Sequence, residues 1–223
     1  VYLFVVKQIR HNPAFRLLKQ AVKENRFGKI YFVNVNVFWA RPQSYYDAAT
    51  WRGTKNMDGG ALMNQAIHYI DLLLWLFGAI QNVQAIMGTL GRNVEVEDTA
   101  TLNLRWQSGM IGSMNVSMLA YLDNLETSIT VLGELGTVKI GGVSGDKILE
   151  WRFADERDDI NDVNVKMSEV SKTGHYYFYK NVIETLRGQS TPESDGKEGL
   201  KSLKFLDAAY RSAVSNHHIE IES

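Results

Sequence analysis

The polar side chains of residues 58–71 are the part of the sequence best suited to chemistry. Asn64, His68 and Asp71 follow one another at i, i+4 and i+7, so on a helix they share one face. Histidine ionises near neutral pH and can take a proton from a hydroxyl. An amide one turn earlier can orient that hydroxyl. The row predicts His68 as a general base or proton relay and Asn64 as its positioning group. The alternative is a histidine satisfied inside the core.

Arginine and aromatic side chains precede this segment. Arg41 and Arg52 are candidates for binding an anion, because a guanidinium can hold two oxygens of a carboxylate or diphosphate at once. The rings of Tyr45, Tyr46 and Trp51 can stack on a sugar or a base, or only fix the loop. We therefore expect an anionic ligand with rings at this loop, with ordinary surface arginines as the alternative.

Three further residues belong to the candidate substrate site. Gln65 follows Asn64 in the same segment, and His175 and Tyr176 begin a late helix. One interpretation brings this late helix to the site, and the other gives its first residues a packing role.

Composition and missing motifs exclude several classes of protein. The chain has 24 Lys+Arg and 25 Asp+Glu among 223 residues, whereas a nucleic-acid binder usually has a basic excess. Its lack of cysteine excludes disulfides and thiolate metal sites. The sequence contains no apolar run of the roughly 18 residues that a membrane span needs, and no H-E-x-x-H. We expect a cytoplasmic protein without metal, nucleic-acid or membrane sites.

Hydrophobic periodicity predicts an α+β domain with a large, mostly antiparallel open β-sheet and helices on one face. Short, glycine-containing turns between successive strands favour antiparallel neighbours. Asp58 is expected to cap the helix that carries His68, and residues 154–172 are expected to form a mobile loop. The alternating residues from Met110 to Met118 are expected to lie in the core or at a subunit interface. The predicted helices are 13–28, 58–77, 174–187 and 197–215, and the predicted strands are 29–41, 81–87, 98–106, 110–119, 126–132, 137–140, 147–153 and 219–221.

The first six residues, Val1–Val6, form a continuous apolar run. Such a run is typical of a strand buried on both faces of a parallel sheet. We expect residues 1–10 to be the remnant of an upstream α/β domain and its crossover, and residues 11–223 to be the C-terminal domain.

Residues 58–73 resemble the C-terminal domain of the glucose–fructose oxidoreductase/inositol dehydrogenase (Gfo/Idh/MocA) family. The resemblance lies in Asp-Gly-Gly, followed by Asn64, His68 four residues later, and Tyr-Ile-Asp-Leu-Leu directly after it. Residues 5–10, 27–30 and 196–203 resemble it too. The resemblance implies a dihydrodipicolinate-reductase-like sheet domain that binds a sugar or polyol and follows a Rossmann domain. NAD or NADP, and the family's catalytic lysine, then belong mainly to the upstream part. We expect the chain by itself to be inactive.

A closer similarity lies in residues 41–47, 51–54 and 60–68, which are similar to the UDP-N-acetylglucosaminuronate dehydrogenases of lipopolysaccharide and O-antigen biosynthesis. That similarity implies oxidation of the 3-hydroxyl of a UDP-sugar. Asn64 stands where many family members have Asp, which weakens the stabilisation of an imidazolium at His68. The alternatives are another sugar or polyol dehydrogenase, and a non-catalytic binding or scaffold module.

A sheet covered by helices on one face has a second face to bury. The family commonly buries it by pairing sheets between subunits, which implies a homodimer or homotetramer. The residues expected at this contact are Asn34, Asn36, Ser113, Asn115 and Ser117.

Overall fold

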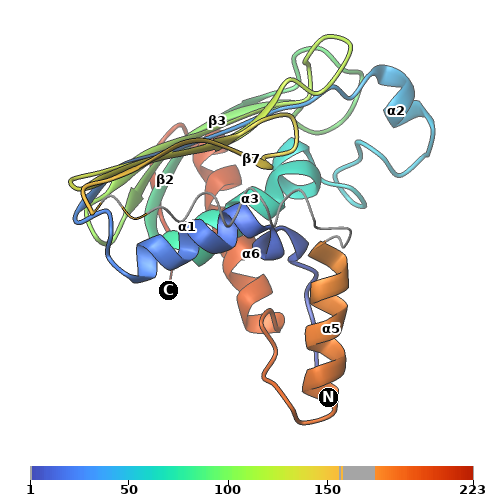
Figure 1. Ribbon diagram of the computed structural model, residues 1–223. Coiled ribbons are helices and arrows are strands. Elements are labelled where there is room, and N and C mark those ends of the chain that lie inside the picture. Colours follow the sequence, from blue (N-terminus) through green and yellow to red (C-terminus); the bar gives the residue numbers. More distant parts are fainter. Residues whose placement is uncertain (1, 156, 158–173, 223) are drawn as a thin grey trace.

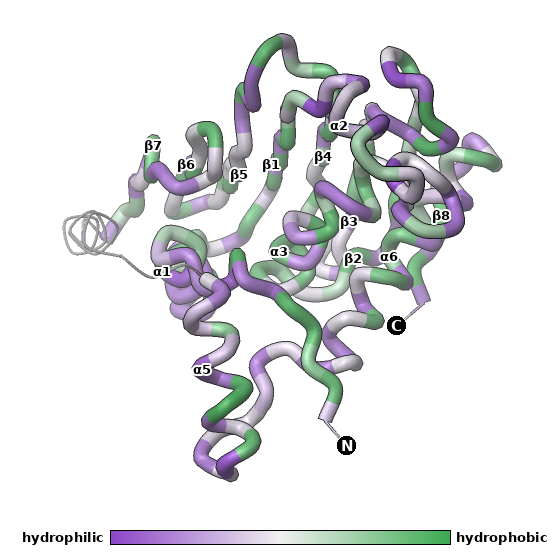
Figure 2. Tube along the Cα trace, turned by 90° about the vertical axis from the view of Figure 1, so that its right-hand side faces the viewer, coloured by the Kyte–Doolittle hydropathy of each residue, from purple (hydrophilic) through white to green (hydrophobic). Residues whose placement is uncertain are grey.

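The computed structural model describes residues 2–155, 157 and 174–222, which form one eight-stranded sheet with helices on one face (Figure 1). The strand order is β7-β6-β5-β1-β4-β3-β2-β8 (Figure 2). This arrangement confirms the predicted fold class. The strands are β1 (Ile30–Phe38), β2 (Ile80–Gly88), β3 (Thr99–Trp106), β4 (Ile111–Ser117), β5 (Glu126–Gly133), β6 (Gly136–Gly141), β7 (Lys147–Phe153) and β8 (Ile219–Glu220). The helices are η1 (Gln8–His11), α1 (Pro13–Lys23), α2 (Gln43–Asp47), η2 (Ala61–Ala66), α3 (Ile67–Phe77), α5 (Gly174–Leu186) and α6 (Gly196–Ser215).

Alternating side chains separate the two faces of the sheet. On β1, Val33, Val35 and Val37 are buried, and the residues between them are partly exposed. The methionines from Met110 to Met118 are likewise buried, which confirms the core alternative for this strand. The apolar face therefore lies under the helices.

The position of β1 differs from the sequence prediction. β4 and β5 were expected to be antiparallel neighbours, but β1 lies between them, parallel to β4 and antiparallel to β5. Gly112 makes this possible, because a Cβ there would lie 2.3 Å from the carbonyl oxygen of Val33 on β1. A pairing between strands so distant in sequence leaves no local signal.

Side-chain capping fixes the first turn of two helices. The Asn12 side chain accepts a hydrogen bond from the Ala14 amide at 2.9 Å, with Pro13 in the first turn of α1. The Asp195 side chain accepts one from the Glu198 amide at 3.0 Å at the start of α6. α1 ends at Lys23, five residues before the predicted end at Gly28, because Asn25 adopts a left-handed conformation with φ of 55°.

The apolar run at the N-terminus does not form a buried strand in the described chain. Tyr2 and Leu3 are 59% and 66% exposed, and Phe4 forms only an isolated bridge with Asp195. No other strand of the described residues lies beside this segment. The neighbours expected for it belong to an upstream domain, so its burial on both faces stays a prediction. The N-terminal segment and α5 project together away from the sheet (Figures 1 and 2). Of the predicted loop 154–172, residue 156 and residues 158–172 lie outside the described residues.

Candidate active site

The helix that carries His68 begins with a π-helical turn, η2, whose N-cap is Gly60. Asp58 does not cap it, so this prediction is wrong. The Asp58 carboxylate instead accepts hydrogen bonds from the Gly53 amide at 2.6 Å and from the side chain of Asn64. π-helical turns are rare and frequently occur at functional sites.

The amides at the start of η2 are satisfied by residues distant in sequence. The Ala61 amide donates to the Glu97 carbonyl at 2.9 Å, and the Leu62 amide donates to the Glu97 carboxylate at 2.9 Å. The Tyr210 hydroxyl donates to the same carboxylate oxygen at 3.0 Å. Glycine at position 60 provides the space for this carboxylate, since a Cβ there would lie 1.9 Å from Glu97 Oε2. Burial raises the pKa of the Glu97 carboxyl.

His68 is half-buried, one residue into α3. Its Nε2 lies 3.4 Å from Nε2 of Gln8, and its Nδ1 is buried without a partner among the described residues. Burial lowers the pKa of His68, as do the charges of Lys7 and His175, whereas the charge of Asp71 opposes them. A neutral imidazole at neutral pH is the form that accepts a proton.

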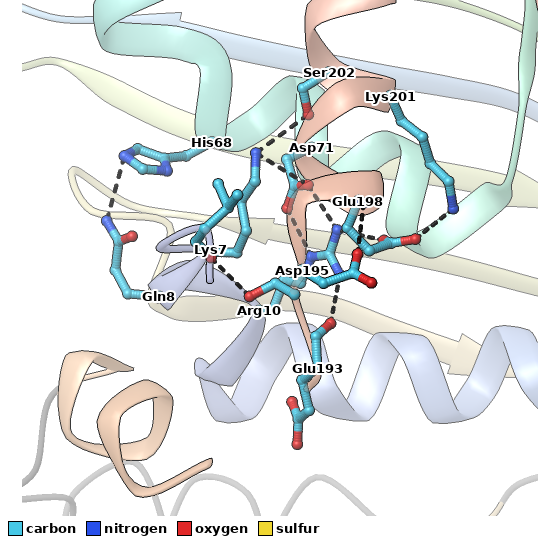
Figure 3. A network of polar contacts seen from close by, with 12 residues as sticks. Lys7, Gln8, Arg10, His68, Asp71, Glu193, Asp195, Glu198, Lys201 and Ser202 are labelled. Atoms are coloured by element: carbon cyan, nitrogen blue, oxygen red, sulfur yellow. Dashed lines mark hydrogen bonds and ion pairs between the residues drawn. The ribbon is translucent and has the colours of Figure 1, made fainter. Parts of the chain in front are cut away.

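Asp71 holds a buried ionic cluster (Figure 3). The Arg10 guanidinium donates two hydrogen bonds of 2.7 Å to its carboxylate, and Lys7 Nζ lies 3.3 Å from it. Arg10 also pairs with Glu198 at 3.0 Å, and Lys7 donates to Ser202 at 3.2 Å. The cluster ties the N-terminal segment to α3 and α6. Of the predicted polar row, Asn64 bonds to Asp58, whereas His68 and Asp71 contact the N-terminal segment.

The second group of predicted site residues meets around Tyr45. Arg41 Nε donates to the Gln65 side chain at 3.2 Å, and the Gln65 amide donates to the Tyr45 hydroxyl at 3.2 Å. The Arg52 guanidinium lies 4.3 Å from the centre of the Tyr45 ring and 5.4 Å from that of Trp51. The structure therefore brings these side chains together, and their role in binding a ligand stays a prediction.

The remaining predicted residues differ in accessibility. Tyr46 is buried, and burial raises its pKa to about 12; its role in binding a ligand stays a prediction. Trp51 is 39% exposed and Tyr176 is 44% exposed. His175 is exposed on the first turn of α5, close enough to His68 for its charge to act on that ring. Gly174 lies close to the Gln8 carbonyl, since a Cβ there would lie 2.1 Å from its oxygen.

Several residues near the site were not identified from the sequence as site residues. Lys7 and Gln8 lie in the segment interpreted as a strand remnant, Glu97 lies between two strands, and Asn124 accepts a hydrogen bond of 3.3 Å from Arg41. Only their tertiary contacts mark them, because no local spacing links them to His68.

The described residues do not form a metal site, in that no group of three or more His, Cys, Asp or Glu side chains there could hold an ion. None of the helices described is both long and apolar enough to cross a membrane.

The sequence pattern of the C-terminal alpha/beta domain of the Gfo/Idh/MocA oxidoreductase family matches residues 19–221. This chain belongs to that family. The Gfo/Idh/MocA assignment agrees with the open sheet and the helices on one face.

Two solved structures of this family are similar over the whole chain. The WlbA dehydrogenase of Bordetella pertussis, in complex with NADH and UDP-GlcNAcA, is 53% identical with a TM-score of 0.96, covering 100% of this chain and 65% of that one. The WlbA dehydrogenase of Chromobacterium violaceum, in complex with the same two molecules, is 54% identical with a TM-score of 0.94, covering 99% of this chain and 63% of that one.

A more distant relative is the D-apiose dehydrogenase of Paraburkholderia graminis, which is 23% identical over 235 residues, covering 100% of this chain and 60% of the relative. The chain therefore spans less than two thirds of the length of each of these three proteins.

Proposed function

We propose that this chain is the substrate-binding half of an NAD(P)-dependent oxidoreductase that oxidises the 3-hydroxyl of a UDP-N-acetylglucosaminuronate-like sugar. The observation that carries the proposal is the 53% identity over the whole chain to a dehydrogenase solved with NADH and UDP-GlcNAcA. The half-buried His68 supports it, because a ring sealed in the core is unavailable to a substrate.

In this proposal His68 is the base. Its Nε2 takes the hydroxyl proton while the C–H bond releases a hydride. Asn64 orients the reacting hydroxyl, and Asp58 in turn orients the Asn64 amide through their hydrogen bond. Asp71 does not act on substrate; it holds α3 against the N-terminal segment.

The group around Tyr45 binds the rest of the sugar nucleotide. Arg41 and Arg52 supply positive charge for the uronate or the diphosphate, and Gln65 supplies hydrogen bonds. Trp51 offers an exposed ring for stacking. His175 and Tyr176, on α5, close the site beside His68.

The dinucleotide belongs to the part of the protein upstream of this domain. The described residues contain one parallel strand pair, β1 and β4, and no strand–glycine loop–helix unit for a pyrophosphate, so they do not fit NAD(P) by themselves. Held by an upstream domain, NAD(P) would supply the nicotinamide that takes up a hydride. We place the boundary of this domain at residue 11.

We further propose a homodimer or homotetramer formed through the open face of the sheet, in a cytoplasmic protein. That face carries Asn34 and Ser113, joined by a hydrogen bond of 3.0 Å, and the exposed side chain of Ile111. Sedimentation at micromolar concentration tests it: Asn115→Arg should give a monomer, and a wild-type monomer contradicts the proposal.

The test of the activity uses the longer protein that includes the upstream domain. NADH formation is measured with UDP-N-acetylglucosaminuronate, UDP-N-acetylglucosamine and free inositol. Turnover with the uronate alone is expected. Turnover with inositol favours a polyol dehydrogenase, and absence of turnover together with tight binding favours a non-catalytic module.

A further inference from the structure

Lys7 and Gln8 come from the segment that leads into the domain, and their side chains reach the start of α3 (Figure 3). The Lys7 side chain is 4% exposed and contacts Asp71 and Ser202 at 3.3 and 3.2 Å. Asp71 already receives two hydrogen bonds from Arg10. Burying a second cation beside a carboxylate that is already paired costs desolvation free energy. Neutralising the charge of Asp71 therefore does not explain why Lys7 is buried here.

Lys7 gives the cluster an excess of positive charge. The cluster has three cations, Lys7, Arg10 and Lys201, but only two carboxylates, Asp71 and Glu198. Three charged or titratable groups act on His68: Lys7 from the N-terminal segment, Asp71 from α3 and His175 from α5. Asp71 would favour a proton on the ring, but its carboxylate is engaged by two cations.

Gln8 acts on the other side of the ring. Its amide group lies 3.4 Å from Nε2 of His68 and is the side-chain hydrogen-bond partner of that ring atom among the described residues. A substrate hydroxyl that reaches Nε2 replaces the Gln8 amide there.

We propose that Lys7 and Gln8 are positioning residues for His68: Lys7 keeps the imidazole in its proton-accepting form, and Gln8 holds the ring so that its Nε2 takes the substrate proton. This inference rests on the function proposed above. It assigns to the segment that joins the two halves of the enzyme a second task, the preparation of the base for each turnover.

The first experiment needs no turnover. The His68 ring is titrated by NMR in the 223-residue chain, and its signals are assigned by their loss in His68→Gln. Lys7→Met should raise the pKa of His68, and Lys7→Arg should restore the wild-type value. Lys201→Met is the matched control, because it removes an exposed cation of the same cluster and should leave His68 unchanged. An unchanged pKa in a folded Lys7→Met protein overturns the inference.

The second experiment measures the pH dependence of kcat/KM in the longer protein. Lys7→Met should move the acid limb to higher pH and lower kcat/KM at mildly acidic pH about threefold or more. Gln8→Ala should lower kcat about tenfold and change KM little; an unchanged kcat overturns the Gln8 assignment. A shift seen by NMR without a matching move of the acid limb overturns the base role of His68, and supports the coupling between Lys7 and His68 alone.

Discussion

The two faces of the sheet differ in the polar groups that they carry and in how those groups are paired. Under the helices, Asp71 and Glu97 are buried and each is held by several donors. On the open face, neutral side chains pair across strands, as Asn115 does with Asn36 at 3.0 Å and with Thr101 at 2.8 Å.

The difference follows from access to water. A buried charge that loses its partner has no solvent to replace it, whereas an amide at the surface exchanges one partner for water at little cost. The covered face can therefore hold groups in unusual protonation states, and the open face can change partners when another surface meets it. Catalysis and association are accordingly expected on opposite faces.

The largest effect is expected for His68→Ala in the longer protein. Loss of the general base should lower turnover by about a hundredfold to ten-thousandfold, with nucleotide affinity similar to wild type. The rate of NADH formation measures turnover, and a dinucleotide binding assay measures the affinity. His217→Ala, on an exposed histidine, is the control; normal turnover in His68→Ala contradicts the assignment.

Next comes the buried ionic cluster. Asp71→Ala should lower the free energy of unfolding by about 3–5 kcal/mol, because it leaves Arg10 and Lys7 buried without their main partner. Asp207→Ala removes an exposed Asp–Arg pair from α6 and should cost less than about 1 kcal/mol. Urea denaturation measures the free energy of unfolding of both variants. Equal losses in the two would contradict the predicted difference between the buried cluster and the exposed pair.

Glu97→Ala should cost about 1–3 kcal/mol, since the Leu62 amide and Tyr210 lose their acceptor. The matched control is Glu95→Ala, at an exposed carboxylate that accepts only from the Lys55 amide among the contacts described.

Glu97 also predicts a pH dependence. Burial raises its pKa in the folded state, so the folded chain keeps this proton to higher pH than the unfolded chain. The contribution of Glu97 to stability therefore decreases as the pH rises from its ordinary pKa to the raised one. Glu97→Gln, which cannot ionise, should flatten this part of the stability profile. An identical profile in both proteins would show that Glu97 does not titrate in this range.

The smallest effect is expected on the open face. Asn115→Ala should change the stability of the isolated chain by less than about 1 kcal/mol. Val116→Ala, its neighbour on the covered face and 1% exposed, should cost about 2 kcal/mol. Urea denaturation of the two variants compares the free energy of unfolding lost at neighbouring positions on opposite faces of the sheet. A larger loss at Asn115 would mean that the polar ladder contributes to the fold itself.

Much of the fold was predictable from local patterns. Alternation placed Val33, Val35 and Val37 on the buried face of β1, and Asn12 with Pro13 marked the start of α1. The Asp-Gly-Gly to His68 segment identified the family. Each of these signals depends on residues within one or two turns of each other, and such spacing is fixed by backbone geometry alone.

What the sequence by itself determined was thus the type of each element, its buried side and the residue types available for acid–base chemistry. Only the tertiary structure decided that β1 lies between β4 and β5, that Glu97 instead of Asp58 satisfies the helix start, and that Lys7 contacts Asp71 and Gln8 contacts His68. These contacts join residues that are 35 to 103 positions apart, and burial of the whole core offsets the entropic cost of closing such loops. No local pattern encodes which distant partner a buried polar group will find.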